Sequence, residues 1–533
     1  MGGTTVDGPN GPMIKSVGEM FGRFVGETTL LLCTWQQKLA DDPGKLEELE
    51  QEIGQSFARG AGLVVAGLVS VVMQTPELAE ASERTRQEFN HPLARGRNRT
   101  IAVRLLGGVM MWVTSLYCEP RRGLFRKPGD HVAGLNIEMA QFGFGKKVSP
   151  GLETRVARQS ALCPSFELAH AELERGGLKI DLKTVRRVSH QCGDELLKLR
   201  TSQLLQWRSG ELISGNELAG KRVAVQIDGG RVRTRGSLRK VTATLETDRN
   251  DGQSTGDVPG RSKPRPKRSF DAEWREPKLM TIFIHNEHGR MKKHSQATID
   301  GTLTGPDATA ELVSMHLHRL GAAKAESISF VGDGAVWIWD RIDAIVSQAG
   351  IPQTVKVHQV LDNCHAVHHV SLALAALGMA EEDRLPQYRE LRTRLRNGQW
   401  RHVVNELQQR ADDNPKIAKL QTEVNYLRKH GDEGRLNYPK FRSLGIPLGS
   451  GAIESCIRRV INLRLKGNGI FWKEANAESM LQLRALVISD RWDEQIRLMR
   501  NFKRKHHDSD WYWSPQPMSS SVEHETTSGQ NSA

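Results

Sequence analysis

Two apolar strands of this chain each end in an aspartate followed by a glycine, and this repeated pattern constrains the fold most. The strand KRVAVQID ends at Asp228, and the strand SISFVGD ends at Asp333. One Asp-Gly pair alone is most often the start of a turn, because both residues favour turns. Two such pairs, each ending an apolar strand, instead predict two carboxylates that lie a few ångströms apart on one edge of a sheet.

The residues around these aspartates alternate between strands and helices. The predicted order is β-β-β-α-β-α-β over residues 221–365, with RVRTR and KLMTIFIHN as the second and third strands and TVKVHQVLD as the last. This order is the ribonuclease H-like outline, in which crossover helices add further strands to three antiparallel ones. We therefore predict an α/β multidomain chain with a mixed five-stranded sheet, flanking helices and an all-helical insertion, preceded by helical and helix-turn-helix regions.

The chain has 533 residues, enough for three or four domains. A polar, basic hairpin extension that could contact phosphates is expected at 246–267. The predicted regions are a helical N-terminal part with a loose, Gly-rich start (1–98), a strand pair with a loop (99–150), a helix-turn-helix whose last helix begins near Asp181 (151–205), the first part of the core (218–368), the helical insertion (369–445), the last acid with C-terminal helices (446–505) and a disordered tail (506–533).

The amino-acid composition indicates what kind of partner the chain binds and in which compartment it is expected. The chain carries 75 Lys and Arg against 62 Asp and Glu, a net charge of +13, which favours a polyanionic partner. Six scattered cysteines without a C-x-x-C pair predict a reducing compartment and no disulfide scaffold. The start lacks the features of a secretory signal, and the most apolar stretch, 61–73, is too short for a bilayer, so a buried helix and a cytoplasmic location are expected.

Clustered carboxylates repel each other, so a divalent cation is expected between Asp228 and Asp333. A pair of Mg²⁺ ions, with Mn²⁺ as a substitute, could deprotonate a water or 3′-hydroxyl and stabilise the leaving oxygen of a phosphodiester. Glu454 in GSGAIES is the candidate third ligand, one turn into a helix with Ser450 as its N-cap. The alternative for Glu454 is an ordinary ion pair with Arg458, four residues further on the same face.

Asp362 is the second candidate for the third ligand, because it ends the last predicted strand in QVLDNCHAV. The D-x-x-H spacing puts Asp362 and His365 at one strand-to-helix corner. His365 could orient the aspartate or hold a phosphate. An ordinary, hydrogen-bonded corner histidine explains the pattern equally well, and a zinc site made of Cys364, His365 and His369 is a further alternative.

Basic residues near these acids are candidates for DNA contact. A solvated hairpin face is the alternative for the arginines after Asp228, and a core position is the alternative for Trp472. Trp337 and Trp339 are expected to pack on the sheet. The candidates are Arg231, Arg233 and Arg235 after Asp228, Arg458, Arg459, Arg464, Lys466, Trp472 and Lys473 after Glu454, and Lys183, Arg186 and Arg187 on the last helix of the helix-turn-helix.

Five segments, IDGGRVRTR, WREPKLMTIF, VGDGAVWIWD, LDNCHAVHHV and PLGSGAIESCIRRVINLRLKGNGIFW, resemble in order those of the ISKra-type insertion-sequence transposases of bacteria. The resemblance covers roughly residues 99–496. It implies a DDE transposase with Asp228, Asp333 and Glu454 as the metal triad, and Asp362 and His365 match the D-x-x-H corner of related families. The chain departs from its relatives in lacking the paired cysteines that often precede the helix-turn-helix.

The resemblance implies that the protein cuts transposon-end DNA and joins the 3′-hydroxyl to target DNA. Its partners would be double-stranded DNA and a second copy of the chain, because two ends must be brought together, and its place would be the bacterial nucleoid. One alternative is a nuclease or resolvase of the same fold without strand transfer. Another is a transposase-derived DNA-binding protein without catalysis.

Overall fold

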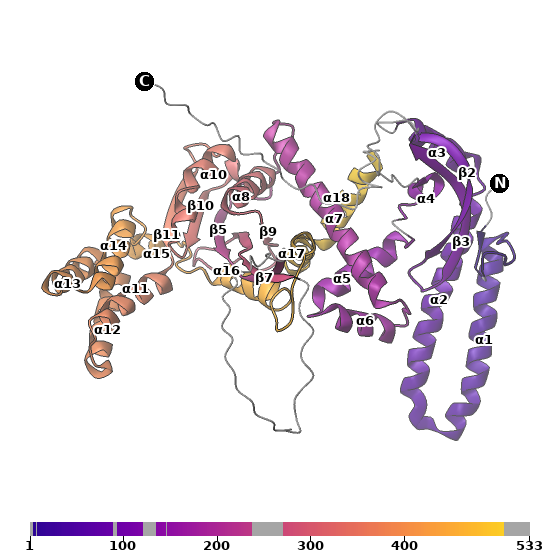
Figure 1. The fold of residues 1–533 in the computed structure, drawn as a ribbon, viewed down its shortest axis with the longest axis horizontal. Helices are drawn as coiled ribbons and strands as arrows, with labels where there is room; N and C mark the ends of the chain where they lie inside the picture. Colours follow the sequence, from indigo (N-terminus) through magenta and orange to yellow (C-terminus); the bar gives the residue numbers. More distant parts are fainter. Residues whose placement is uncertain are drawn as a thin grey trace, which may run out of the picture. The chain divides into compact units, whose positions relative to one another are not determined.

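The computed structural model describes residues 4–6, 8–88, 93–120, 135–144, 147–236 and 270–505. The chain divides into two compact units, one of residues 1–212 with 482–533 and one of residues 213–481. The extension expected at 246–267 and the tail expected at 506–533 lie outside the described residues. The chain is α/β, and one of its sheets is mixed and five-stranded, as the sequence predicted (Figure 1).

The first unit contains an antiparallel sheet in the order β1-β3-β2, with β4 also paired to β3. The strand pair predicted around a Gly-Gly turn is confirmed as β2 and β3. A Cβ at Gly107 in this turn would lie 2.0 Å from the carbonyl oxygen of Ala58, so the turn contacts α2 directly. The bounds are β1 Thr4–Thr5, β2 Leu93–Arg104, β3 Met110–Pro120, β4 Leu135–Asn136, α1 Val17–Asp41, η1 Pro43–Lys45, α2 Leu46–Val72, α3 Pro76–Glu88 and α4 Ile137–Gln141.

Two features of this region differ from the expectation. Thr4 pairs with Val113 in β3, so part of the start predicted to be loose is a strand. Helix α2 extends well beyond the apolar stretch 61–73, and within the described residues the helical stretch Pro43–Val72 is long and apolar enough to cross a membrane, judged by length and composition alone. A core helix passes the same test, and Leu63 and Ala66 of α2 are fully buried.

The first unit also contains a group of helices that includes the predicted helix-turn-helix. Helix α7 begins at Leu182, next to Asp181, as the sequence predicted. Asp181 is its N-cap and accepts a hydrogen bond from the Thr184 N–H at 2.8 Å. The C-terminal helices expected within 446–505 include α17 and α18, with a left-handed residue, Asp490 (φ 58°), between them. The bounds are α5 Pro150–Leu162, α6 Phe166–Arg175, α7 Leu182–Arg208 and α18 Trp492–Lys505, and α17 (Glu474–Ile488) begins in the second unit and ends in the first.

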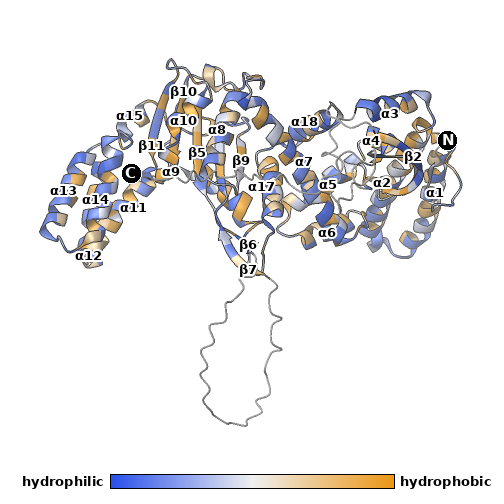
Figure 2. Cartoon of the chain, turned by 45° about the horizontal axis from the view of Figure 1, so that its top comes forward, coloured by the Kyte–Doolittle hydropathy of each residue, from blue (hydrophilic) through white to orange (hydrophobic). Residues whose placement is uncertain are grey.

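The second unit is built on the five-stranded sheet, whose order is β11-β10-β5-β8-β9. β10 runs parallel to β5 and β11, whereas β8 runs antiparallel to β5 and β9. The strands β5 and β10 are markedly hydrophobic (Figure 2). Their bounds are β5 Arg222–Gly229, β8 Lys278–Ile284, β9 Thr298–Thr302, β10 Ser327–Gly332 and β11 Lys356–Leu361.

The second and third core strands were partly misassigned from the sequence. RVRTR is β6 (Val232–Gly236), which pairs with β7 (Asp271–Arg275) in a separate two-stranded sheet. The missing core strand is β9, TIDGT, in which every residue is buried, so it lacks the alternation that marks a half-exposed strand. The helix expected after β10 is broken into α9 (Val336–Trp339) and α10 (Ile342–Gln348).

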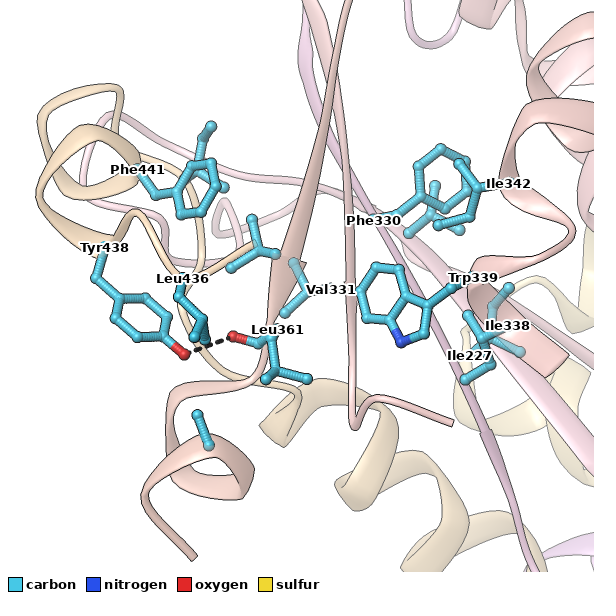
Figure 3. Close-up of a cluster of buried hydrophobic side chains, with 14 of the residues drawn as sticks. Ile227, Phe330, Val331, Ile338, Trp339, Ile342, Leu361, Leu436, Tyr438 and Phe441 are labelled. Carbon is cyan, nitrogen blue, oxygen red and sulfur yellow. Dashed lines mark hydrogen bonds between the residues drawn. The ribbon is translucent and has the colours of Figure 1, made fainter. Parts of the chain in front are cut away.

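Helices cover this sheet and continue into a helical segment after β11. Trp339 packs among Phe330, Val331 and Ile342, as expected for a residue that packs on the sheet, and the Tyr438 hydroxyl donates to the Leu361 carbonyl at 3.1 Å (Figure 3). The helix bounds are α8 Pro306–Leu320, η2 Ala322–Lys324, α11 Asn363–Ala376, α12 Glu381–Arg396, α13 Trp400–Asp413, α14 Ala418–Asp432, α15 Tyr438–Ser443, α16 Gly451–Cys456 and the π-helix η3 Ile457–Asn462.

Candidate metal centre

Three acidic residues follow one another across the sheet edge where the parallel strands β5, β10 and β11 end. Val331 pairs with Gln226, and extending this ladder by two residues sets Asp333 beside Asp228. The Asp362 N–H donates to the Gly332 carbonyl at 2.8 Å, so Asp362 follows on the other side. Neighbouring strands lie about 4.8 Å apart. This edge therefore carries three neighbouring aspartates, one more than the Asp-Gly pattern predicted.

Asp228 and Asp333 accept few hydrogen bonds for half-buried carboxylates. Asp228 Oδ1 accepts from the Gly229 N–H at 2.6 Å, and Asp333 Oδ1 accepts from the Ala335 N–H at 3.0 Å. Among the described residues, none donates a hydrogen bond to Oδ2 of either aspartate. A carboxylate can accept about four hydrogen bonds. Both side chains therefore retain oxygen lone pairs that a cation could use.

Asp362, in contrast, is buried and hydrogen-bonded on both oxygens. Oδ1 accepts from the N–H groups of Cys364 (2.5 Å) and His365 (3.0 Å) at the start of α11. Oδ2 accepts from the hydroxyl of Ser450 (2.5 Å) and from its backbone N–H. Burial raises the pKa of Asp362, but the contacts with His365 and Ser450 outweigh burial and hold this pKa well below its usual range. Asp362 is thus a fixed anion that joins α11 to the turn before α16.

Glu454 lies on α16, whose N-cap is Ser450 as predicted. The Ser450 hydroxyl does not cap the helix, because it lies 2.5 Å from Asp362 Oδ2 and 3.2 Å from Glu454 Oε1. A hydroxyl has one proton, and the shorter contact assigns it to Asp362. No ion pair joins Glu454 to Arg458 in the described part of the chain, so the structure does not support that alternative. Glu454 is exposed and, like Asp228 and Asp333, has unused oxygens.

Gln226 fixes the position of α16 on the sheet. Its side chain is buried in β5, donates to the Gly449 carbonyl and accepts from the Ile453 N–H, both at 3.0 Å. Sequence reasoning missed this residue. The single polar side chain within the apolar run VAVQI was the signal that could have found it, because a buried amide needs hydrogen-bond partners.

Asp362, His365 and Glu454 form a group that could hold a metal ion, because one ligand atom of each lies within 4.8 Å of the others. The group shares only Glu454 with the predicted triad of Asp228, Asp333 and Glu454. Its carboxylates and imidazole suit several divalent cations, so it does not identify the metal.

His365 faces the acids with a nitrogen that has no hydrogen-bond partner. Its Nδ1 is buried, accepts and donates no hydrogen bond, and lies 3.6 Å from Asp362 Oδ1. The contact with Asp362 raises the pKa of His365 against the effect of burial, and the charges of Asp333 and Glu454 add to the increase. His365 is therefore paired with the Asp362 carboxylate at the strand-to-helix corner.

The environment of Asp228 shows that the acids influence one another. The pKa of Asp228 is raised to about 6, chiefly by burial and to a smaller extent by the charges of Asp333 and Glu454. The Gly229 N–H and His365 act in the opposite direction. Like charges gathered at a partly buried site are costly unless a cation neutralises them. A cation bound near these acids would offset this cost.

Two of the three arginines predicted to contact DNA after Asp228 are engaged within the protein. Arg233 donates to the Gly467 carbonyl and lies 4.7 Å from the ring centroid of Phe471. Arg235 donates through Nε to the Phe471 carbonyl at 3.2 Å. Both side chains fasten β6 to the segment after η3. Arg231 is exposed and has no such partner among the described residues.

The basic group after Glu454 divides into buried and exposed members. Arg464 is 3% exposed and Trp472 is 7% exposed, and the guanidinium lies 5.3 Å from the indole centroid. The Trp472 Nε1–H donates to the Leu465 carbonyl at 3.0 Å. The prediction that Arg464 and Trp472 face DNA is therefore corrected: both belong to the core. The exposed members are Arg458, Arg459, Lys466 and Lys473.

The predicted DNA contacts of the first unit lie on the first turns of α7. Lys183 and Arg186 are exposed, and Arg187 is half-buried. Arg186 forms an ion pair with Glu167 of α6, so this arginine also holds the helix pair together.

The zinc alternative is not supported within the described residues. His369 Nδ1 lies 2.5 Å from Glu423 Oε2, and its ring stacks on Tyr426 at 3.6 Å. Cys364 is exposed and does not belong to the group that could hold a metal.

No family model, curated protein or solved structure matches this chain. The resemblance to ISKra-type transposases therefore depends on the quoted sequence motifs alone.

Proposed function

We propose that this protein is a divalent-metal-dependent polynucleotidyl transferase, a transposase that cuts the DNA ends of its element and joins the released 3′-hydroxyl to target DNA. The observation that carries the proposal is that Asp228 and Asp333 end neighbouring parallel strands with unused carboxylate oxygens, and that the charges of Asp333 and Glu454 both act on Asp228. Nucleic acid is the substrate that also accounts for the net charge of +13.

The order of strands supports a ribonuclease H-like core. Counted along the chain, β5, β8, β9, β10 and β11 are strands 1 to 5, and their order across the sheet is 3-2-1-4-5 with strand 2 antiparallel to its neighbours. In this outline the carboxyl ends of strands 1 and 4 are adjacent, and these ends carry Asp228 and Asp333. The helices between β11 and α16 correspond to the proposed insertion before the last acid.

Asp228, Asp333 and Glu454 are the proposed ligands for Mg²⁺ or Mn²⁺, and His365 lies beside them. Their unused carboxylate oxygens fit a hard divalent cation. Bound Mg²⁺ would lower the pKa of an attacking hydroxyl and offset the charge on the phosphate. Asp362 cannot bind a cation without giving up a hydrogen bond, so we assign to it the task of holding Ser450, and hence α16, in place.

In the proposed reaction, water attacks the phosphorus at a transposon end, the bond to the 3′ oxygen breaks, and that oxygen takes a proton. The released 3′-hydroxyl then attacks a target phosphodiester and gives up its proton to solvent, while the bond from that phosphorus to the target's own 3′ oxygen breaks and this oxygen takes a proton. Protonated His365 would contact a phosphate oxygen, because the acids around it raise its pKa. The exposed cations Arg231, Arg458, Arg459, Lys466 and Lys473 would contact the DNA backbone.

The proposal is tested by incubating the purified protein with its element's end DNA and Mg²⁺ or Mn²⁺. We expect nicks that leave 3′-hydroxyls. Asp228→Asn, Asp333→Asn and Glu454→Gln should each slow cutting by about 1000-fold, because each removes an anionic ligand at the reacting centre. DNA retention on a filter should stay within about twofold. Glu382→Gln, which removes an exposed acid on α12, is the matched control and should cut normally.

Undiminished cutting in all three variants would overturn the assignment of the site. Cutting without joining would assign the protein to the nuclease or resolvase class. DNA retention with no cutting by the unaltered protein would leave the non-catalytic DNA-binding alternative.

A further inference from the structure

Tyr426, in the helical segment after β11, contacts the proposed metal site at Asp333. The Tyr426 hydroxyl on α14 donates to the backbone carbonyl of Asp333 at 2.8 Å. The adjacent residue, Gly334, has a φ of 92°, and a Cβ there would lie 2.0 Å from the Tyr426 oxygen. The chain at Asp333 is therefore shaped to accept this tyrosine, and a larger residue at 334 would exclude it.

Tyr426 is itself held in a fixed orientation. Its ring stacks on His369 with centroids 3.6 Å apart and 20° between the planes. His369 is fixed in turn by Glu423, one turn before Tyr426 on the same helix. His430, one turn after Tyr426, contacts the ring edge-on with centroids 4.6 Å apart. The tyrosine is thus braced by side chains from α11 and α14.

The Tyr426 hydroxyl keeps the proton that it donates at physiological pH. Burial raises the pKa of Tyr426, and the charges of Asp333 and Asp362 raise it further, so the group stays protonated. Burial and the charge of Arg435 lower the pKa of His430 to about 3, so this neighbour stays neutral.

The position of the Asp333 carboxylate depends on how its backbone is held, because the carboxylate accepts few hydrogen bonds. The Ala335 N–H is the one described donor to its carboxylate, and the residue lies beyond the last ladder pair of β10. We propose that Tyr426 is a positioning residue that holds the Asp333 backbone so that its carboxylate points at the cation. This inference rests on the proposed function, and it makes the helical segment a part of the metal site.

The test uses the full chain and Mn²⁺ alone as the probe, with affinity measured by calorimetry. Tyr426→Phe keeps the stacked ring and removes the hydroxyl. It should bind Mn²⁺ about tenfold more weakly, as expected when a group that orients a ligand is lost. Its cutting rate at low Mn²⁺ should fall, its DNA affinity should not change, and high Mn²⁺ should restore the rate. A purely structural role would not give this recovery.

Tyr438→Phe is the matched control. Its hydroxyl also donates to a carbonyl at a strand end, that of Leu361 (Figure 3), but the next residue, Asp362, has hydrogen bonds to both oxygens. Tyr438→Phe should therefore leave Mn²⁺ affinity unchanged. Glu423→Gln, which weakens the support of His369, should give a smaller loss than Tyr426→Phe and guards against misfolding of one variant.

Equal Mn²⁺ affinity of Tyr426→Phe and the unaltered protein would overturn the inference, even if the unaltered protein cuts DNA. Weaker binding by Tyr426→Phe in a protein that does not cut DNA would uphold the positioning role and overturn the proposed function. Absence of Mn²⁺ binding by the unaltered protein would overturn both.

Discussion

The aspartates at the ends of β11 and β5 lie in opposite electrostatic environments: the pKa of one is lowered and the pKa of the other is raised. Asp362 at the end of β11 is buried, accepts four hydrogen bonds and has a lowered pKa. Asp228 at the end of β5 accepts one hydrogen bond and has a pKa raised to about 6. The fold stabilises the charge on one aspartate and destabilises the charge on its near neighbour.

This contrast separates an acid that holds the structure together, Asp362, from an acid that is a proposed ligand of a cation, Asp228. Hydrogen bonds to a charged group contribute about 1.5–3 kcal/mol each. A protein gives up that stabilisation at Asp228 only where something else, such as a cation, supplies it. The number of donors around a carboxylate therefore indicates its role more directly than its position at a strand end.

The largest effect on stability is expected from Asp362→Asn. The amide would point an N–H group at existing donors, so the free energy of unfolding at pH 7 should fall by about 3 kcal/mol. Because the pKa of Asp362 is lowered from 3.8, the stability that it contributes is present above about pH 4 and is lost as the pH falls further. Urea unfolding at pH 7 and pH 3 measures both values. A loss below 0.5 kcal/mol at pH 7 would contradict the structural role.

A smaller effect of opposite sign is expected from Asp228→Asn. The folded protein raises the pKa of Asp228 from 3.8 to about 6, so the folded state loses stability as the pH rises through this range. Without a divalent cation, the variant should be more stable than the unaltered protein at pH 8 by about 1 kcal/mol, and not at pH 3.5. Thermal melts at both pH values check the sign. Added Mg²⁺ should stabilise the unaltered protein and not the variant.

The arginines of α12 also differ in whether they form ion pairs within the protein. Arg394 pairs with Glu390 and Glu406, whereas Arg389, Arg392 and Arg396 share an exposed face and have no ion pair among the described residues. Arg392 and Arg396 also act electrostatically on Cys364, beside the metal group.

We expect this face to contact DNA phosphates. Replacing Arg389, Arg392 and Arg396 together by alanine should reduce the slope of log affinity against log salt by about 2.7, at about 0.9 for each contact. Arg394→Ala is the control and should change the slope by less than about 0.5. Equal slopes for the two variants, measured by fluorescence anisotropy, would show that pairing within the protein does not decide which arginines contact DNA.

The sequence predicted what local patterns determine. Apolar runs with Asp-Gly ends located β5 and β10, and the QVLD run located β11, so the sheet edge could be anticipated. The sequence did not reveal that RVRTR lies outside the five-stranded sheet or that TIDGT takes its place. A fully buried short strand such as TIDGT lacks the alternation of apolar and polar residues that marks a half-exposed strand. The roles of Gln226, Ser450 and Tyr426 depend on partners far away in the chain. Arg464 and Trp472 were misjudged because a basic, aromatic run does not reveal which side chains turn inward.

The chain leaves the sheet at Asp362 and returns to it at Ser450, and these two residues are hydrogen-bonded to each other. The Ser450 hydroxyl donates to Asp362, and the Asn363 N–H donates to the Leu448 carbonyl at 2.9 Å. A core whose exit and return already touch can close around segments of very different length, because joining the ends costs little extra entropy as a loop grows. Exchange of residues 377–437, which leaves α11 and His365 in place, for another folded module is thus compatible with the position of Glu454. The module that replaced them would inherit the task of supporting Asp333.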